Sequence, residues 1–169
     1  MKKLIGDHDG FVDNINKNLA EIGIDTRSEF TICDHLCYRV GTDERYEEMK
    51  TLLGSGATNI GEVPVSGRLI STFELQEPLK TGGWVIPWIE LPAPKEGSGY
   101  EEGLEHAEFV VVKSLDDFRA RHSDLPFNDK GMSKVINPEL GLKLPGLSVK
   151  FHEIALGAVV RLEGRLEKD

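Results

Sequence analysis

Three histidines and one glutamate lie in β-prone segments far apart in this sequence, and together they could bind a metal ion. Neutral imidazole nitrogen and carboxylate oxygen are the ligands that Zn, Ni, Fe and Mn accept, at about 2.0–2.2 Å. Ligands from distant strands, with coordination positions left open, are typical of catalytic metal sites. The sequence therefore indicates a site for one divalent metal ion, of one of these four kinds, built from two or three imidazoles and a carboxylate, with His35, Glu90, His106 and His152 as the candidates.

The alternation of side chains along a strand predicts which residues accompany these four. In residues 105–112, Ala107 and Phe109 form the apolar side, which leaves His106 and Glu108 on the other side. A curved sheet packs its apolar side under helices, so the polar sides of several strands should line one cleft. The predicted lining consists of His35, Arg39, Trp88, Glu90, His106, Glu108, Lys150 and His152.

The residues next to His35 are predicted to have other roles. Alternation turns Asp34, and likewise Glu105 beside the second histidine, away from the cleft, so neither is expected to bind the ion. Cys33 and Cys37 fall on the face of His35, but neighbours on one face stand about 7 Å apart and could hardly all reach one small ion. We interpret both as pocket-wall or core residues. Four positions apart in one strand, roughly 13 Å, they cannot form a disulfide.

Five residues in or near the predicted cleft could contact a substrate. Arg39, Arg68 and Lys150 could bind its carboxylate or phosphate group. An equally good alternative is that these cations neutralise the carboxylates of Glu90, Glu108 and Glu74. Trp88 is a stacking or a packing residue, with packing favoured, and Tyr100 is either a lid or donor or part of a surface loop.

The elements that position these residues follow from hydrophobic periodicity and from glycine and proline signals. Apolar residues at helical spacing predict a helix over residues 10–22 and a second over 43–53. A helix is also predicted to begin at Ser114, and a last one to span about 154–167. Strands are predicted at 31–40, 58–64, 68–75, 83–91, 105–112, 133–144 and 147–153.

The order strand, helix, three strands occurs twice, which suggests an internal duplication. Each unit opens with an acid followed by histidine. We expect an α+β fold in a single domain, 1–169, in which two βαβββ modules, about 30–92 and 105–154, form a curved mixed sheet with a metal cleft. A linker, 93–104, joins the modules, the helices lie on the convex face, and an N-terminal helix precedes them.

Composition and charge exclude several classes of partner. A formal net charge of -9 and a pI near 5.1 give no positive field for nucleic acid or an anionic membrane surface. No segment approaches the roughly 20 apolar residues of a membrane helix, and the N-terminus lacks a signal peptide's apolar run. We expect a cytoplasmic monomer or homodimer with a small-molecule ligand. His8 and His122 are expected on the solvated surface.

A set of short motifs between about residues 30 and 155 resembles the bacterial YecM-like family. The motifs are Asp34-His35 with Arg39, Gly67-Arg68, Trp84 leading to Ile89-Glu90-Leu91-Pro92, Tyr100-x-x-Gly103-x-Glu105-His106-x-Glu108, Asn137-Pro138 and Lys150-Phe151-His152. That family is similar to the vicinal oxygen chelate superfamily, which includes glyoxalase I, methylmalonyl-CoA epimerase, extradiol dioxygenases and the bleomycin-resistance proteins.

The resemblance implies two βαβββ modules around a metal cleft, with ligands from the first and last strands of each module. It assigns His35 and Glu90 to the first module and His106 to the second. At the fourth position the sequence departs from the superfamily's usual glutamate. Alternation turns Glu153 toward the helices and favours His152, but a β-bulge would reverse this choice.

The expected function is that of a divalent-metal-dependent enzyme, of the isomerase, lyase or oxidoreductase class, acting on a small oxygenated molecule bound through the metal. Isomerase or lyase chemistry needs a base near the ion, and Glu90 and Glu108 are the candidates. The alternative is a protein that binds or sequesters a small molecule without catalysis, as the bleomycin-resistance proteins do. A third reading is a metal site with a purely structural role.

Overall fold

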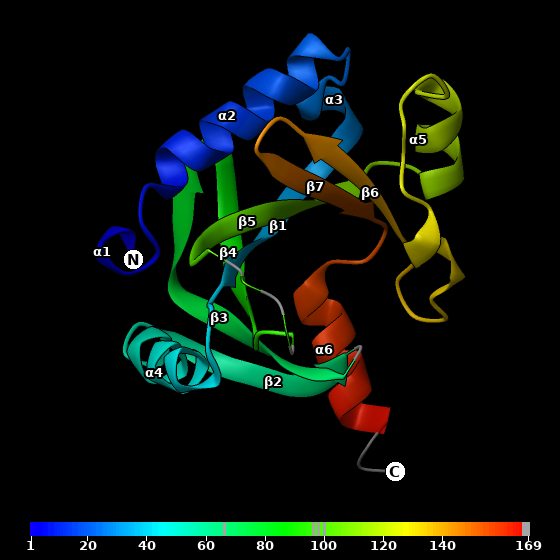
Figure 1. Ribbon diagram of the computed structural model, residues 1–169. Coiled ribbons are helices and arrows are strands. Elements are labelled where there is room, and N and C mark those ends of the chain that lie inside the picture. Colours follow the sequence, from blue (N-terminus) through cyan, green and yellow to red (C-terminus); the bar gives the residue numbers. More distant parts are fainter. Residues whose placement is uncertain (66, 96, 98, 100, 167–169) are drawn as a thin grey trace.

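Seven strands form one mixed sheet with β1 at its centre (Figure 1). The computed structural model describes residues 1–65, 67–95, 97, 99 and 101–166. The strands are β1 (Phe30–Arg39), β2 (Ala57–Val65), β3 (Arg68–Thr81), β4 (Trp84–Pro92), β5 (Gly103–Val111), β6 (Glu139–Leu144) and β7 (Leu147–His152). Their order in the sheet is β2-β3-β4-β1-β5-β7-β6. The predicted fold class is confirmed.

The helices surround this sheet. They are α1 (Lys2–Ile5), α2 (His8–Glu21), α3 (Thr26–Glu29), α4 (Asp43–Gly54), α5 (Leu115–Arg121) and α6 (Leu156–Leu166), with a 3-10 turn, η1, at Lys130–Ser133. Helix α2 packs against β3 and β5, and α4 packs against β2, β3 and β4. No helix among the described residues is long and apolar enough to span a membrane.

The two predicted modules differ in their number of strands. The first runs β1–α4–β2–β3–β4, as predicted, but in the second only β6 and β7 follow α5. Where a further strand would pair with β6, the described chain makes a single bridge between Asn128 and Gly141. Pro126 and Pro138 flank this stretch, and proline cannot donate a hydrogen bond to a sheet. The strand predicted at 133–144 accordingly begins only at Glu139.

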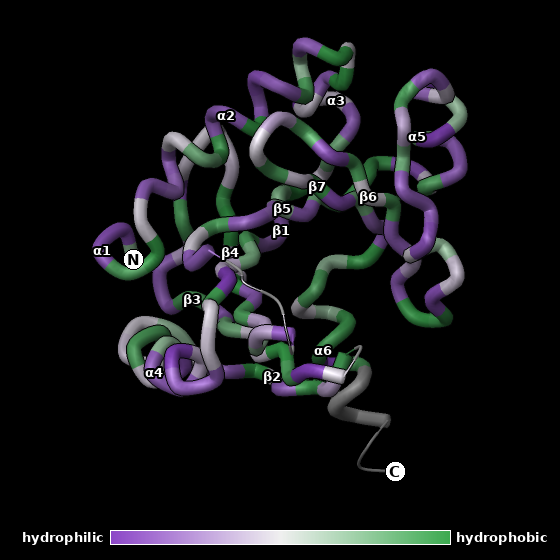
Figure 2. Tube along the Cα trace, viewed as in Figure 1, coloured by the Kyte–Doolittle hydropathy of each residue, from purple (hydrophilic) through white to green (hydrophobic). Residues whose placement is uncertain are grey.

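A cluster of phenylalanine rings forms the core beneath β1, β5 and β7. The ring of Phe30 lies 4.9 Å from that of Phe109 and 5.3 Å from that of Phe151, between centroids. Phe118 of α5 joins the cluster at 4.7 Å from Phe151. Hydrophobic and hydrophilic residues alternate along α2 (Figure 2), whose buried face covers another part of the same core. Burial of these apolar faces therefore fixes which side of the sheet remains for polar residues.

Helix α6 lies on that remaining side. It contacts β2 and β3, and Arg161 pairs with Glu74 at 2.5 Å. Glu74 stands opposite Trp88 in the register of β3 and β4. Gly157 packs directly against the ring of Trp88. Because Trp88 and Glu90 are two apart in β4 and share one face, α6 covers part of the face that carries Glu90.

The contact between Gly157 and Trp88 gives a prediction for stability. A Cβ atom at position 157 would overlap the Trp88 ring, so Gly157→Ala should shift α6 and lower the free energy of unfolding by about 1–3 kcal/mol. The loss in the free energy of unfolding can be measured by urea denaturation, monitored by tryptophan fluorescence. Gly54→Ala is the control, because a Cβ there meets nothing within 4 Å. It should leave stability unchanged or raise it by up to about 1 kcal/mol. Equal effects of the two changes would contradict this packing.

Candidate metal centre

Four side chains from three neighbouring strands meet on the polar side of the sheet. One donor atom each from His35, Glu90, His106 and Glu108 lies within 4.8 Å of all the others. Oε1 of Glu108 is 3.0 Å from Nε2 of His106 and 3.4 Å from Nε2 of His35, and Oε2 of Glu90 is 4.0 Å from Nε2 of His106. Ligands of one ion with bonds near 2.1 Å stand roughly 3.0–4.2 Å apart. The arrangement could therefore hold one divalent ion after small movements.

The register of the central strand brings these residues together. In the antiparallel pairing of β1 with β5, His35 stands opposite Glu108 and Cys37 opposite His106. In the parallel pairing of β1 with β4, Cys37 stands beside Glu90. The donors therefore occupy adjacent positions across three strands although they lie far apart in the sequence.

Asp34 and Glu105 do not point away from the cluster, and the prediction that they do is wrong. The pairing of β1 and β5 shifts register between Cys33 and His35 and again between Cys37 and Tyr38. The extra residues at these two β-bulges are the two acids, and a bulge re-aims side chains. Oδ1 of Asp34 accepts a hydrogen bond from Nδ1 of His35 at 2.7 Å, and Glu105 binds Nδ1 of His106 in the same way.

These paired acids determine which ring nitrogen faces the cluster. In a neutral imidazole, a carboxylate that binds Nδ1 keeps the proton there, so the lone pair is on Nε2 and the ring orientation is fixed. In both histidines it is Nε2 that approaches Glu108. The two rings are thereby arranged as metal ligands.

The first bulge also changes the position of Cys33. Cys33 belongs to the hydrophobic core, whereas Cys37 lies beside Glu105 and His106. The prediction that both cysteines share the face of His35 therefore fails for Cys33. Burial raises the pKa of the Cys33 thiol well above its usual range. Both cysteines are free, as predicted.

The charged groups of the cluster stabilise one another. Lys150 donates a hydrogen bond of 2.8 Å from Nζ to Oε1 of Glu108. Although burial opposes ionisation, Lys150 and His35 hold the pKa of Glu108 well below its usual range. Burial likewise opposes a charge on His35, but Asp34 and Glu108 raise the pKa of its ring. Asp34 is also buried, yet the two histidines near it lower its pKa to about 2. Glu108 and Asp34 are thus anionic, and Glu108 is able to bind a cation.

His152 lies beside the group of four donors. The fourth donor of that group is Glu108. The Nε2 atom of His152 is 3.3 Å from Oδ2 of Asp34 and 3.9 Å from Oε2 of Glu108. Its role as a metal ligand stays a prediction. Glu153 is on the helix side of β7, as alternation predicts, where it accepts a hydrogen bond from the backbone N–H of Leu115 at 2.8 Å.

The strand register gives the position in the second module that corresponds to Glu90. In the first module Trp88 pairs with His35, and Glu90 lies two residues after Trp88. In the second module Ser148 pairs with His106, and the residue two positions on is Lys150. A lysine therefore stands where the symmetry of the modules would place a second glutamate, and its charge is directed at Glu108.

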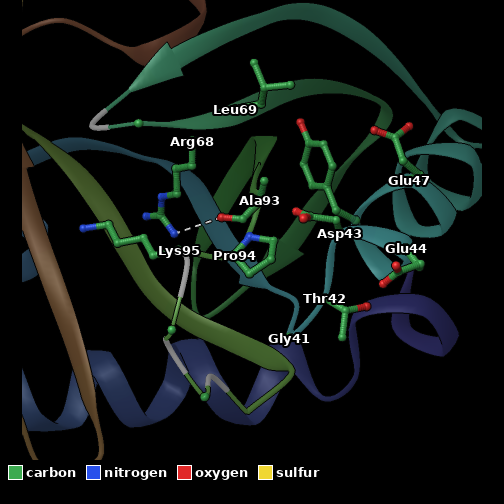
Figure 3. A pocket seen from close by; sticks show the side chains of 14 residues that line it. Gly41, Thr42, Asp43, Glu44, Glu47, Arg68, Leu69, Ala93, Pro94 and Lys95 are labelled. Atoms are coloured by element: carbon green, nitrogen blue, oxygen red, sulfur yellow. Dashed lines mark hydrogen bonds between the residues drawn. The ribbon is translucent and has the colours of Figure 1, made fainter.

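The predicted substrate-binding residues lie in different surroundings. Arg39 pairs through Nη2 with Oε1 of Glu105 at 2.9 Å. Trp88 is buried under α6, and Tyr100 lies outside the described residues. Arg68 donates a hydrogen bond to the carbonyl of Ala93 at 3.2 Å. It lines a separate cavity of about 950 Å³ beside the start of α4 (Figure 3). Substrate binding by these residues stays a prediction. Lys150 pairs with Glu108, as the alternative interpretation predicts.

His8 and His122 are not on the solvated surface, so that prediction is wrong. His8 is only 8% exposed. Nε2 of His122 pairs with Oε2 of Glu29 at 2.8 Å, in a cluster that includes Arg121. Glu29 precedes His122 by 93 residues, so no local pattern could reveal the pair.

Sequence reasoning missed the parts played by Asp34, Glu105 and Asn137. The signal for the two acids is the repeated acid-histidine pair, which marks both bulges. Asn137 has a positive φ of 50°, and asparagine is among the residues that adopt this conformation most readily. Its side chain makes a hydrogen bond with the ring of His152.

The sequence matches a known family over most of its length. The family model of the YecM protein matches residues 1–133. Protein YecM of Escherichia coli (strain K12) is 32% identical over 120 residues, which are 69% of this chain and 56% of the relative. An uncharacterized protein of Haemophilus influenzae is 35% identical over 78 residues, 46% of this chain and 41% of the relative. The chain thus spans about half the length of the curated relatives it matches.

Solved structures share the fold. A structural-genomics target, Protein EC4020, superposes with a TM-score of 0.78 at 24% identity, over 96% of this chain and 92% of that one. Methylmalonyl-CoA epimerase from Mycobacterium tuberculosis superposes with a TM-score of 0.56 at 17% identity, over 85% of this chain and 99% of the epimerase. The fold is that of the vicinal oxygen chelate superfamily, and both the predicted family and the predicted fold are confirmed.

Proposed function

This chain belongs to the YecM family, and from that premise we propose that it is a divalent-metal-dependent enzyme. Its substrate is a small oxygenated molecule bound through the metal, and its chemistry is a proton transfer of the isomerase or lyase type. The observation that carries the proposal is the convergence of His35, Glu90, His106 and Glu108 within 4.8 Å. Zn, Ni, Fe and Mn suit two imidazoles with carboxylates.

The donor set fits such an ion. Nε2 of His35 is buried and has no hydrogen-bond partner among the described residues. A buried polar atom without a partner costs roughly 1–3 kcal/mol, and a metal ion bound at this atom would remove that cost. Carboxylates that bind Nδ1 of metal-binding histidines are a regular feature of zinc sites.

The distances suggest different roles for the two glutamates. Glu108 approaches both Nε2 atoms, at 3.0 and 3.4 Å, and Lys150 keeps it anionic, so we assign it to the ion together with His35 and His106. Glu90 is farther away, 4.0 Å from His106, and its side chain is more exposed. A general base must be near the reacting carbon and free to take a proton. We therefore assign proton abstraction to Glu90.

The ion would polarise a substrate carbonyl and so make the adjacent C–H bond more acidic. In this arrangement Glu90 accepts the proton on a carboxylate oxygen and returns it to the substrate. Trp88, which shares the face of Glu90, excludes water from one side. Lys150 keeps a positive charge beside the developing anion.

Hydrogen–deuterium exchange tests this function. The protein, loaded with each of the four metals, is incubated in D₂O with small hydroxyketones, 2-oxo acids and acyl thioesters, and deuterium at the carbon next to the carbonyl is followed by NMR. We expect exchange with the metal-loaded protein and none after chelation. Glu90→Gln should keep the metal and lose exchange, while Glu108→Gln should lose both. A compound that binds at the metal without exchange would instead support the sequestration alternative.

Asp34 provides a further test of the site. Removing the charge that holds Nδ1 of His35 should lower metal affinity, because partners of ligand histidines typically contribute 10–100-fold to metal affinity. We expect a decrease of about that size for Asp34→Asn, measured by competition with a chromophoric chelator. Asp117→Asn is the control, since Asp117 pairs with Arg121 on α5. Equal affinities in the two variants would show that Asp34 does not support the site.

A further inference from the structure

The side chain of Asn137 has a fixed orientation. Its Oδ1 atom accepts a hydrogen bond from the backbone N–H of Ile154 at 3.0 Å, and its Nδ2 atom donates to the carbonyl of Ile154 at 2.7 Å. A backbone N–H can only donate and a carbonyl can only accept, so the amide cannot be turned around. The same Nδ2 atom lies 2.6 Å from Nδ1 of His152.

This contact determines the tautomer of His152. Because the amide nitrogen of Asn137 has hydrogens and no acceptor lone pair, Nδ1 of His152 must accept the bond. In a neutral imidazole whose Nδ1 accepts, the proton is on Nε2. A nitrogen that bears a proton has no free lone pair for a metal ion.

The Nε2 atom of His152 faces the carboxylate of Asp34. His152 is 2% exposed. Its Nε2 atom makes no hydrogen bond among the described residues and lies 3.3 Å from Oδ2 of Asp34, so a small rotation of the ring would complete a hydrogen bond to that oxygen. That oxygen also accepts a hydrogen bond from the backbone N–H of Leu156 at 2.7 Å. The other oxygen of Asp34 binds Nδ1 of His35. The contacts thus run from Asn137 through His152 and Asp34 to His35.

We propose that His152 is a positioning residue that acts as an Nε2–H donor toward Asp34, and thereby orients His35, and that it is not a metal ligand. The proposal rests on the metal site proposed above. In the second half of the site Arg39 has the corresponding place: it binds Glu105, which holds His106. Each acid is therefore held between its own histidine and a second, positively polarised side chain.

The tautomer can be read by ¹⁵N NMR of the histidine rings in metal-free protein at pH 8. We expect the Nε2–H pattern for His152, and the same pattern after zinc is added, while the Nε2 signals of His35 and His106 shift. In Asn137→Asp the carboxylate can only accept, so the proton should move to Nδ1. An Nδ1–H pattern in the wild-type protein, or an Nε2 signal of His152 that shifts on zinc binding, overturns the proposal.

Zinc affinity of two variants gives an independent readout. The amide of His152→Gln can still donate to Asp34, so its affinity should stay close to that of the wild type. His152→Ala removes the donor and should lose about 10–100-fold, as expected for partners of ligand histidines. Equal, large losses in both variants would identify a ligand and overturn the proposal. If zinc bound to no form of the protein, the proposed function would fail, whereas the tautomer would remain measurable in the metal-free protein.

Discussion

His106→Ala is expected to remove bound metal from the protein while the fold persists. Nε2 of His106 lies within 4.0 Å of both glutamates of the cluster. Without the His106 ring, the group of four donors would keep two carboxylates and a single imidazole, that of His35. The loss of affinity should exceed the roughly 10–100-fold effect typical of residues that only support a ligand. His35→Ala should behave in the same way.

The measurement is the metal content of protein purified without chelator, dialysed and analysed by atomic emission. His122→Ala is the matched control, because His122 also pairs with a buried glutamate but lies at the end of α5. We expect stoichiometric metal in the wild type and in this control, and none in the two site variants. The same trace of metal in all four proteins would refute the site.

Phe109→Ala should cause the largest loss of stability. Phe109 is fully buried and contacts the rings of Phe30, Trp84 and Phe151, at centroid distances of 4.9, 5.6 and 6.4 Å. Truncation of a buried phenylalanine typically costs 3–5 kcal/mol, through lost burial and the cavity that remains. We expect a decrease in the free energy of unfolding of about 3–5 kcal/mol by urea denaturation.

Val135→Ala serves as the reference for this measurement, because Val135 is 99% exposed. Its effect should stay within about 0.5 kcal/mol. If Phe109→Ala lowered the free energy of unfolding by less than about 1 kcal/mol, the phenylalanine cluster would not be a main source of the stability of the core. Since Phe109 follows Glu108 in β5, its truncation should also loosen the metal site, which the metal content of the same variant would reveal.

Alternation along the strands gave correct faces wherever the pairing is regular. His106, Glu108 and Phe109 in β5, and Phe151 and Glu153 near the end of β7, lie on the predicted sides. It failed for Cys33, Asp34 and Glu105, each at or next to a bulge in the pairing of β1 with β5. A bulge is a property of two strands together, so the periodicity of one strand does not reveal it.

The sequence by itself determined the types of donor side chain, the apolar faces that form the core, and the order of elements in the first module. These follow from neighbours a few residues apart, which set local periodicity. The tertiary structure alone decided that Glu108 is one of the four donors, that each acid holds its adjacent histidine, and that α6 covers Trp88. Such contacts join distant parts of the chain, as between Leu156 and Asp34, 122 residues apart. They depend on strand register and on packing across the whole sheet, which no local pattern encodes.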